Sequence, residues 1–235
     1  MSILEAKNIT KKFGGIVALN DLSLCVARNT IAGLIGPNGS GKTTFINLVT
    51  GFYETNHGKL FFNGKRINGR KPHEIPRLGI GRTFQETRVF RKMTVIENVL
   101  VASPYGTSRQ SMEKARELLE FVELFDLKNE YSGNLSYGQQ KLLALVRVLM
   151  LDPQLILLDE PTAGINPVLI EKLLKYFSVL RDQGKTLIMV EHNISVINGI
   201  CEKAIVLDHG QKIAEGTPEE IQRNKIVQDV YLGVG

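Results

Sequence analysis

Four short, continuous apolar runs predict the buried strands of one sheet. They are Ile31–Ile35, Leu155–Leu158, Thr186–Val190 and Ala204–Leu207. Helix-like segments separate the last three runs. Strands that alternate with helices form parallel sheets, because the crossover between parallel strands is long enough to hold a helix. The pattern therefore predicts an α/β fold with a parallel core sheet.

The chain before the first of these runs has a different pattern. The strings ILEA and IVALNDLSLCVA lie within residues 3–32 and predict antiparallel strands between turns. A hairpin is expected over Lys59–Ile67, because its Asn63-Gly64 pair favours the two-residue turns of hairpins. We therefore expect an antiparallel β subdomain beside residues 36–43, which follow the first run of the core.

Helical patterns dominate the middle and the end of the chain. Thr94 and Glu97 have the spacing of a capping box ahead of an apolar helix. Residues 111–125 repeat apolar side chains at helical spacing. A last helix should begin at Thr217, where a first-turn proline and Glu220 complete another capping box.

We expect a single domain, residues 1–235, that contains an inserted lobe. A chain of 235 residues with 43% hydrophobic and 23% charged residues is ordinary for one large globular domain. The helical patterns of residues 86–149 interrupt an α/β core made of residues 1–85 and 150–235. A lobe inserted there suggests a part that moves against the core or docks onto a partner.

The string GPNGSGKT at residues 36–43 is the strongest chemical signal. It matches the phosphate-loop pattern G-x-x-x-x-G-K-[ST], between a predicted strand and a helix expected over residues 44–49. Lys42 would reach the β- and γ-phosphates of a nucleotide, and Thr43 would hold Mg²⁺. The alternative is a glycine-rich turn without a ligand, which the full match in this context disfavours. The expected phosphate-binding residues are Gly36, Pro37, Asn38, Gly39, Ser40, Gly41, Lys42, Thr43 and Thr44.

Two acids follow the apolar run that ends at Leu158. Carboxylates at the C-terminal end of a parallel strand lie where ligands bind in open α/β sheets. Asp159 is expected to hold Mg²⁺ through water, and Glu160 to polarise a water for attack on the γ-phosphate. The alternative is a strand end with two solvated acids, which is the weaker interpretation beside a phosphate loop.

A second string, LSYGQQ at residues 135–140, is expected to begin a helix that runs through Met150. Ser136 is suited to cap this helix, and its hydroxyl, the Gly138 N–H and the helix N-terminus would form an anion site. A plain helix cap is the alternative, but a cap requires neither Gly138 nor the glutamines that follow it.

Charge and cysteine content add little. A net charge of +5 without a block of five or six like charges favours an ordinary solvated surface, so we expect no nucleic-acid partner. The chain has no apolar run of eighteen residues, and its start lacks the apolar core of a secretion signal. Cys25 and Cys201 lie in apolar stretches and are expected to be buried, reduced thiols.

With these strings the chain resembles ATP-binding cassette (ABC) ATPases over essentially its whole length. LSYGQQ is similar to the ABC signature LSGGQ, which is largely private to that family. The resemblance implies that Phe13 stacks on adenine, that Gln85 contacts Mg²⁺ and the attacking water, and that His192 contacts the γ-phosphate. It also implies that residues 163–167 (AGINP) form the D-loop.

Two positions depart from the family pattern. Tyr137 stands where the signature usually has glycine, and its ring lies either over the nucleotide of a partner or against the lobe. Asn166 replaces the usual D-loop aspartate, which keeps hydrogen-bonding capacity but removes a charge.

The resemblance implies a head-to-tail dimer with ATP at its interface. The phosphate loop and the signature of one chain cannot contact the same ATP. Ser136 and Gly138 of one chain would therefore close over ATP that Lys42 of another chain holds, and hydrolysis would open the interface. The second subunit would be an identical chain or a paralogous cassette.

A narrower resemblance is to the importer ATPases for branched-chain amino acids. It rests on residues 81–102 (GRTFQETRVFRKMTVIENVLVA), on SYGQQ and AGINP, and on VYLG at residues 230–233. It implies a peripheral subunit at the cytoplasmic face of the cell membrane that powers uptake of branched-chain amino acids or a similar small solute. Two permeases would be its direct partners, and a solute-binding protein an indirect one. Val89, Phe90 and Met93 would line the groove for a permease helix or fill the lobe's own core.

Three other classes of protein fit the sequence less well. An ATPase of the lipopolysaccharide-export type is the nearest, because it is also a stand-alone cassette on a membrane complex. Soluble ABC ATPases that act on ribosomes or DNA usually carry two cassettes or a long coiled coil, and this sequence shows neither. A kinase or GTPase is disfavoured by the signature and by the lack of an N-K-x-D string.

Overall fold

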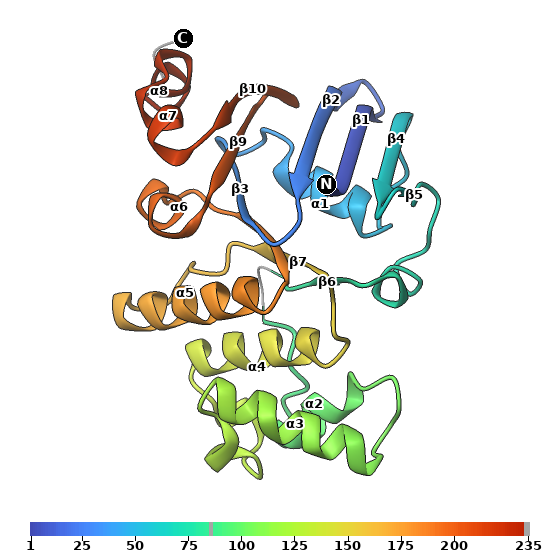
Figure 1. Cartoon of the computed structure of the whole chain (residues 1–235), viewed down its shortest axis with the longest axis vertical. Helices are drawn as coiled ribbons and strands as arrows, with labels where there is room; N and C mark the ends of the chain where they lie inside the picture. The colour runs from blue at the N-terminus through green and yellow to red at the C-terminus, as the bar shows by residue number, and fades with distance from the viewer. Residues whose placement is uncertain (85–86, 233–235) are drawn as a thin grey trace.

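A mixed sheet forms the centre of the molecule, as the alternation of strands and helices predicts (Figure 1). The computed structural model describes residues 1–84 and 87–232. Within them this sheet has six strands, and every neighbouring pair except β10–β9 runs parallel. In spatial order they are β10 (Gln211–Gly216), β9 (Lys203–Asp208), β3 (Ile31–Ile35), β8 (Thr186–Val190), β7 (Leu155–Asp159) and β6 (Ile80–Arg82). Four of them coincide with the predicted runs, whereas the sequence patterns do not predict the three-residue β6 or the polar edge strand β10.

A second sheet is antiparallel, as predicted, and lies at the upper right of Figure 1. Its order is β2 (Ile16–Ala27), β1 (Ser2–Phe13), β4 (His57–Phe62) and β5 (Lys65–Arg66). Asn63 and Gly64 join β4 to β5 with positive φ values of 51° and 73°. Both central residues of the tightest hairpin turns need this conformation, so the predicted hairpin is confirmed.

The predicted helix starts are confirmed by their caps. Thr94, Ser136 and Thr217 each form a capping box with the residue three positions later. The helix expected through Phe125 ends at Phe121 instead, because Glu123 has a left-handed φ of 58° that no α-helix can include. The helices are α1 (Lys42–Val49), α2 (Val95–Val101), α3 (Arg109–Phe121), α4 (Tyr137–Leu149), α5 (Pro167–Asp182), α6 (Ile194–Ile200), α7 (Pro218–Arg223) and α8 (Lys225–Leu232), with short 3-10 turns η1 (Pro76–Leu78), η2 (Phe125–Leu127) and η3 (Ser132–Asn134).

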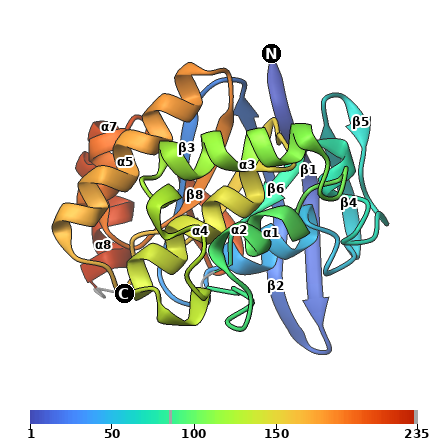
Figure 2. The ribbon, with the colours of Figure 1, turned by 90° about the horizontal axis from the view of Figure 1, so that it is seen from below.

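Helices α2, α3 and α4 gather at the end of the molecule away from the antiparallel sheet (Figure 1), and Figure 2 looks onto them from that end. All three fall within residues 86–149, the segment for which we predict a helical lobe. Helix α4 contacts both α2 and the sheet strand β6, so it joins this group of helices to the core.

Two apolar clusters cover the two faces of the central sheet. Side chains alternate across a strand, and on β3 Ile31 and Ile35 join a cluster with α4, α5 and α6, whereas Ala32 and Leu34 join a cluster with α1 and the antiparallel sheet. The sheet is buried on both faces, which explains why its central strands are continuous apolar runs.

The two cysteines differ, and the expectation that both are buried is wrong for Cys25. Leu24 and Val26 of β2 face the core, so the alternation of the strand places Cys25 on the exposed face. Cys201 is buried, and burial raises the pKa of its thiol to about 12.

None of the helices formed by residues 1–84 and 87–232 combines the length and the apolarity that crossing a membrane requires.

Candidate functional site

The phosphate loop leaves the end of β3 and enters α1 through a backbone that glycine permits. Gly36 has a φ of 148°, and a Cβ atom there would lie 2.0 Å from the carbonyl oxygen of Leu207 on β9. Helix α1 begins after Gly41, and no described side chain caps its N-terminus. The loop therefore packs tightly against the sheet while its helix end remains available to an anion.

Lys42 lies inside this loop. Its Nζ atom donates to the carbonyl oxygens of Gly36 and Pro37, both at 2.8 Å, and approaches the Ser40 hydroxyl at 3.4 Å. The side chain is buried, and burial lowers the pKa of Lys42, while Glu160 and Asp159 act in the opposite direction. All three of these acceptors are neutral oxygens.

A cleft of 140 Å³ opens above the loop and brings together residues from three parts of the chain. The expected phosphate-binding residues on its wall are Asn38, Gly39, Gly41, Lys42, Thr43 and Thr44. Glu160, after β7, and His192, after β8, complete the lining. Their side chains are in contact, with 2.6 Å between His192 Nε2 and Glu160 Oε1. The cleft thus places a carboxylate and an imidazole opposite an anion-binding loop.

Asp159 is not exposed to this cleft but forms a buried ion pair. Its Oδ2 atom accepts from Nη2 of Arg82 at 2.9 Å, and both side chains are at most 10% exposed. Arg82 also donates to Asn47 Oδ1 at 2.6 Å and to Thr50 Oγ1 at 3.2 Å on the α1 side. The sequence reasoning missed Arg82, because its partner is 77 positions away and β6 has no periodic signal.

The side chains expected to hold Mg²⁺ have the chemistry that this ion requires. Thr43, in the first turn of α1, lines the cleft with its hydroxyl-bearing side chain, and the buried Asp159 ends β7. Both offer oxygen donors, which Mg²⁺ prefers. The ion pair with Arg82 uses Oδ2, so a contact through water to the other carboxylate oxygen is compatible with it. The third expected ligand, Gln85, lies outside the described residues.

Phe13, expected to stack on adenine, ends β1 away from the lining of the cleft. Its ring is 40% exposed and packs edge-on against Tyr53, with 5.0 Å between the ring centroids. The Lys11 ammonium lies 4.8 Å from the Phe13 centroid. This cluster offers an exposed aromatic face beside a cation, and the adenine contact stays a prediction.

The structure does not bring Ser136 and Gly138 to the cleft. Ser136 Oγ accepts from Gln139 N at 3.3 Å, and Gln139 Oε1 accepts from Ser136 N at 2.9 Å. Gly138 is buried so closely against Leu169 of α5 that a Cβ atom would lie 2.1 Å from that side chain. Ser136 and Tyr137 are exposed at the end of α4. Any anion they contact must therefore come from outside this nucleotide cleft.

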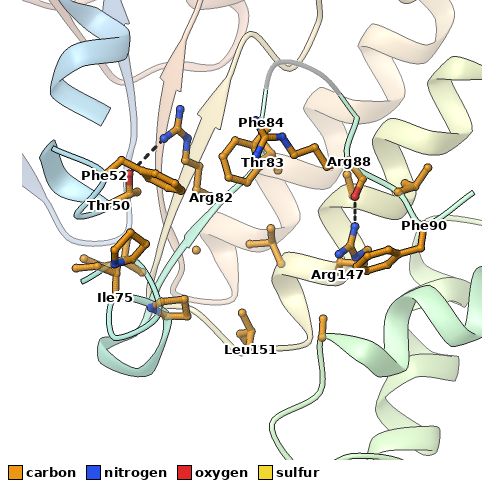
Figure 3. Close-up of a pocket in the computed structure, with 18 residues that line it drawn as sticks. Thr50, Phe52, Ile75, Arg82, Thr83, Phe84, Arg88, Phe90, Arg147 and Leu151 are labelled. Atoms are coloured by element: carbon orange, nitrogen blue, oxygen red, sulfur yellow. Dashed lines mark hydrogen bonds between the residues drawn. The ribbon is translucent and has the colours of Figure 1, made fainter. Parts of the chain in front are cut away.

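A separate groove of 540 Å³ lies between η1, β6 and α4 (Figure 3). Aromatic rings and guanidinium groups share its wall: Phe52, Phe84, Phe90, Arg82, Arg88 and Arg147. The guanidinium of Arg147 stacks 4.8 Å from the Phe90 centroid and donates to the Arg88 carbonyl (Figure 3). Val89 also lines the groove. Phe90 is 47% exposed, so its ring lines the groove and does not fill the core of the lobe.

Two buried donors in this groove have no acceptor in the described part of the chain. They are the Nε atoms of Arg82 and Arg147, and burial lowers the pKa of Arg147. An unsatisfied buried donor costs about 1–3 kcal/mol. Both nitrogens are inaccessible to solvent, so a partner in the groove would meet the exposed Phe90 ring and Arg88 side chain instead.

The C-terminal helix reaches the phosphate loop. Tyr231 of α8 packs against the cluster that contains Ile35. Burial raises the pKa of Tyr231 to about 12, while the nearby Gly36 backbone N–H acts in the opposite direction without meeting the geometry of a hydrogen bond. The sequence reasoning used Tyr231 only as part of the VYLG string and did not predict this contact.

Known families and proteins resemble the chain closely. The family model described as ABC transporter matches residues 19–163, and the model described as branched-chain amino acid ATP-binding cassette transporter matches residues 211–235. A probable branched-chain amino acid transport ATP-binding protein, LivG of Archaeoglobus fulgidus, is 44% identical over 247 residues. That alignment covers 99% of this chain and 96% of the relative.

Solved structures have the same fold. The ADP conformation of MJ1267, an ATP-binding cassette of an ABC transporter, aligns with a TM-score of 0.92 and 35% identity over 99% of both chains. A dimeric post-hydrolysis state of the cassette MJ0796, bound to ADP and Pi, aligns with a TM-score of 0.81 and 29% identity over 92% of this chain and 98% of that chain. The predicted cassette fold is confirmed, and so is the resemblance read from the motifs. The chain belongs to the ATP-binding cassette family of ABC transporters, whose members are nucleotide-binding ATPases.

Proposed function

We propose that the chain hydrolyses ATP as the peripheral subunit of an ABC importer for branched-chain amino acids or a similar small solute. The motifs of the importer branch, the match of residues 211–235 and the name of the LivG relative support this assignment. Its working place is the cytoplasmic face of the cell membrane. Its partners are permease subunits and, indirectly, a solute-binding protein, and no nucleic acid takes part.

One observation carries the catalytic part of the proposal, namely the cleft that unites the phosphate loop with Glu160 and His192. Lys42 and the loop N–H groups bind the phosphates. Glu160 accepts a proton from the attacking water, a contribution of about 10²–10⁴ in rate. His192, whose Nε2 lies 2.6 Å from Glu160 Oε1, contacts the γ-phosphate beside it.

Mg²⁺ neutralises charge on the phosphates when it is bound. Thr43 and Asp159 are the described residues that would hold it, and Gln85 is the third residue proposed for this role. Arg82 keeps the Asp159 carboxylate buried and oriented through their 2.9 Å ion pair.

We infer a head-to-tail dimer from the incomplete nucleotide site of the single chain. Ser136 and Gly138 lie outside the lining of the cleft, yet Ser136 is exposed at a helix N-terminus that favours anions. A second cassette that presents this segment would close the cleft. The dimeric state of the related MJ0796 cassette supports this arrangement.

The groove of Figure 3 is proposed as the contact with the permease. A short permease helix with apolar side chains and a carboxylate would cover the rings of Phe84 and Phe90. The guanidinium groups of Arg88 and Arg147 on the same wall would face its carboxylate. Val89 contributes to the same wall, whereas Met93 is not among the lining residues.

The substitution Glu160→Gln tests the proposal. We expect steady-state hydrolysis to fall by about 10²–10⁴ while ATP still binds. Gel filtration of this variant with Mg-ATP should show a dimer, and without nucleotide a monomer. Hydrolysis near the parent rate would contradict the role of Glu160, and a monomer at saturating ATP would contradict the dimer.

The solute needs a separate assay. The chain reconstituted with its permeases should hydrolyse ATP faster when a binding protein loaded with leucine, isoleucine or valine is added. An unloaded binding protein is the control, and equal rates with both would contradict the proposed solute class.

A further inference from the structure

Glu160 has a backbone conformation that its surroundings must maintain. Its φ is 48°, in the left-handed region that costs a residue with a side chain about 1–3 kcal/mol. Its N–H donates to the Val190 carbonyl at 3.0 Å, which ties the turn to β8. Its own carbonyl accepts from the Ala163 N–H at 3.2 Å. The direction of the Glu160 side chain therefore depends on how firmly this turn is fixed.

Lys141 supplies two charge-assisted contacts to that turn. It projects from α4, the helix that the signature begins, and its Nζ atom donates to the Glu160 carbonyl at 3.0 Å and to the Pro161 carbonyl at 3.1 Å. The side chain is half-buried, so these charge-assisted bonds are shielded from water. Two carbonyls that point at one ammonium fix the path of the chain through Glu160 and Pro161.

A buried acid extends this contact to the other side of the cleft. Glu191 is 3% exposed and accepts from the backbone N–H of Thr162 at 2.9 Å and from its hydroxyl at 2.7 Å. Glu191 directly precedes His192. Burial lowers the pKa of Lys141, and the charges of Glu191 and then Glu160 oppose that effect. The charge of the buried Glu191 therefore acts on the Lys141 ammonium.

The unusual signature residue covers the same lysine. The Tyr137 ring centroid is 5.4 Å from Lys141 Nζ, and the ring lies 3.1 Å from where a Cβ of Gly164 would be. Of the two placements that the sequence left open for Tyr137, the single chain shows the ring over Lys141 of the lobe, where it also packs on its own D-loop, and the placement over a partner's nucleotide stays a prediction. Signature, D-loop and the turn of Glu160 are therefore in direct contact within one chain.

We propose that Lys141 is a positioning residue for Glu160 and that it ties the signature helix to the turn that carries this acid. The inference rests on the proposed role of Glu160 as proton acceptor. Because Ser136 and Gly138 are proposed to contact the partner's ATP, α4 then connects the nucleotide of one site to the acid of the other. Closure of the signature on one nucleotide fixes the acid that serves the second.

The substitution Lys141→Met tests this role, since it keeps the aliphatic stem and removes the donors. Misplacement of a catalytic group by about 1 Å costs ~10²-fold in rate. We expect kcat to fall on that scale, while the Kd for ATP, measured by equilibrium binding, stays at the parent value. Lys172→Met is the matched control, because it removes the lysine of a distant ion pair with Glu123, and its kcat should equal that of the parent.

A double variant separates positioning from stability. Lys141→Met also leaves Glu191 without its nearby cation and should lower Tm. Adding Glu191→Gln removes that charge and keeps an acceptor for Thr162, so Tm should recover. A kcat that stays low in the double variant supports positioning, and a kcat that recovers together with Tm would overturn it.

Failure of the positioning role of Lys141 can be distinguished from failure of the proposed function. If Glu160→Gln is inactive while Lys141→Met hydrolyses ATP at the parent rate, the positioning role alone is wrong. If Glu160→Gln retains the parent rate, the proton-acceptor role is wrong and the positioning role falls with it.

Discussion

Two helix N-termini, those of α1 and α4, are built in opposite ways. Helix α1 follows Gly41 and has no side-chain cap among the described residues, whereas α4 is capped by Ser136 and Gln139 in both directions. The first leaves backbone N–H groups available beside a cleft that also contains Glu160 and His192. The N-terminus of α4 pairs its backbone N–H groups with its own side chains and lies exposed, away from that cleft. In this chain the uncapped start of α1 lies at the nucleotide cleft, whereas the capped start of α4 lies on the exposed surface that is proposed to meet a second chain.

The largest expected effect comes from removing the charge of Lys42 at the N-terminus of α1. Lys42→Ala eliminates charge-assisted hydrogen bonds to phosphate, each worth about 1.5–3 kcal/mol. We expect ATP affinity to fall about 10- to 100-fold. Isothermal titration of the variant against the parent measures the loss. Lys59→Ala, an exposed lysine on β4, serves as the control, and equal losses in both variants would contradict a specific role for Lys42.

The protonation of Lys42 gives the same site a pH dependence. Burial lowers its pKa, and the anionic ligand prefers the protonated form, so affinity is full below this pKa and falls as pH rises through it. The decline amounts to about tenfold per pH unit and should begin below the ordinary lysine range. The charge of Glu160 raises this pKa, so Glu160→Gln should move the decline to lower pH. An unchanged profile in that variant would refute the electrostatic coupling.

What could be predicted from the sequence depends on how far apart in the chain the contacting residues lie. The loop around Lys42, the hairpin at Asn63 and the capping boxes are local, because their residues lie within a few positions of each other. The ion pair of Arg82 with Asp159 and the bonds of Lys141 to Glu160 join distant segments, and only the packing of β6 and α4 on the sheet creates them. A three-residue strand such as β6 is too short to show a periodic pattern, so the sequence does not predict such a contact.

Cys25 and Tyr137 illustrate the same limit. An apolar string around Cys25 predicts a strand correctly, but only the pairing of the sheet decides which alternate side chains face the core. The position of the Tyr137 ring on Gly164 depends on how α4 meets the D-loop. The family motifs predict which residues matter, and the tertiary contacts show what each of them touches.

The second terminus can be tested with a pair of matched caps. Ser136→Ala and Thr94→Ala each remove the side-chain acceptor of a capping box, and each should lower the free energy of unfolding by about 1 kcal/mol. Only Ser136→Ala should also weaken ATP-driven dimerisation, by about tenfold for one lost hydrogen bond to a charged group. Gel filtration in the Glu160→Gln background measures this. Equal dimerisation of both variants would mean that the Ser136 hydroxyl is only a cap.

The smallest expected effect concerns Asn166, which caps α5 where the family usually has aspartate. Its Oδ1 accepts from the Leu169 N–H at 2.9 Å. Asparagine and aspartate are equally good caps, so Asn166→Asp should leave the unfolding free energy unchanged, whereas Asn166→Ala should lower it by about 1 kcal/mol. ATP turnover should be the same in Asn166→Asp and the parent, because the local contact needs an oxygen and not a charge. Faster turnover in Asn166→Asp at equal stability would show instead that the dimer uses the charge, and the D-loop would then belong with α4 as a surface completed only by the second chain.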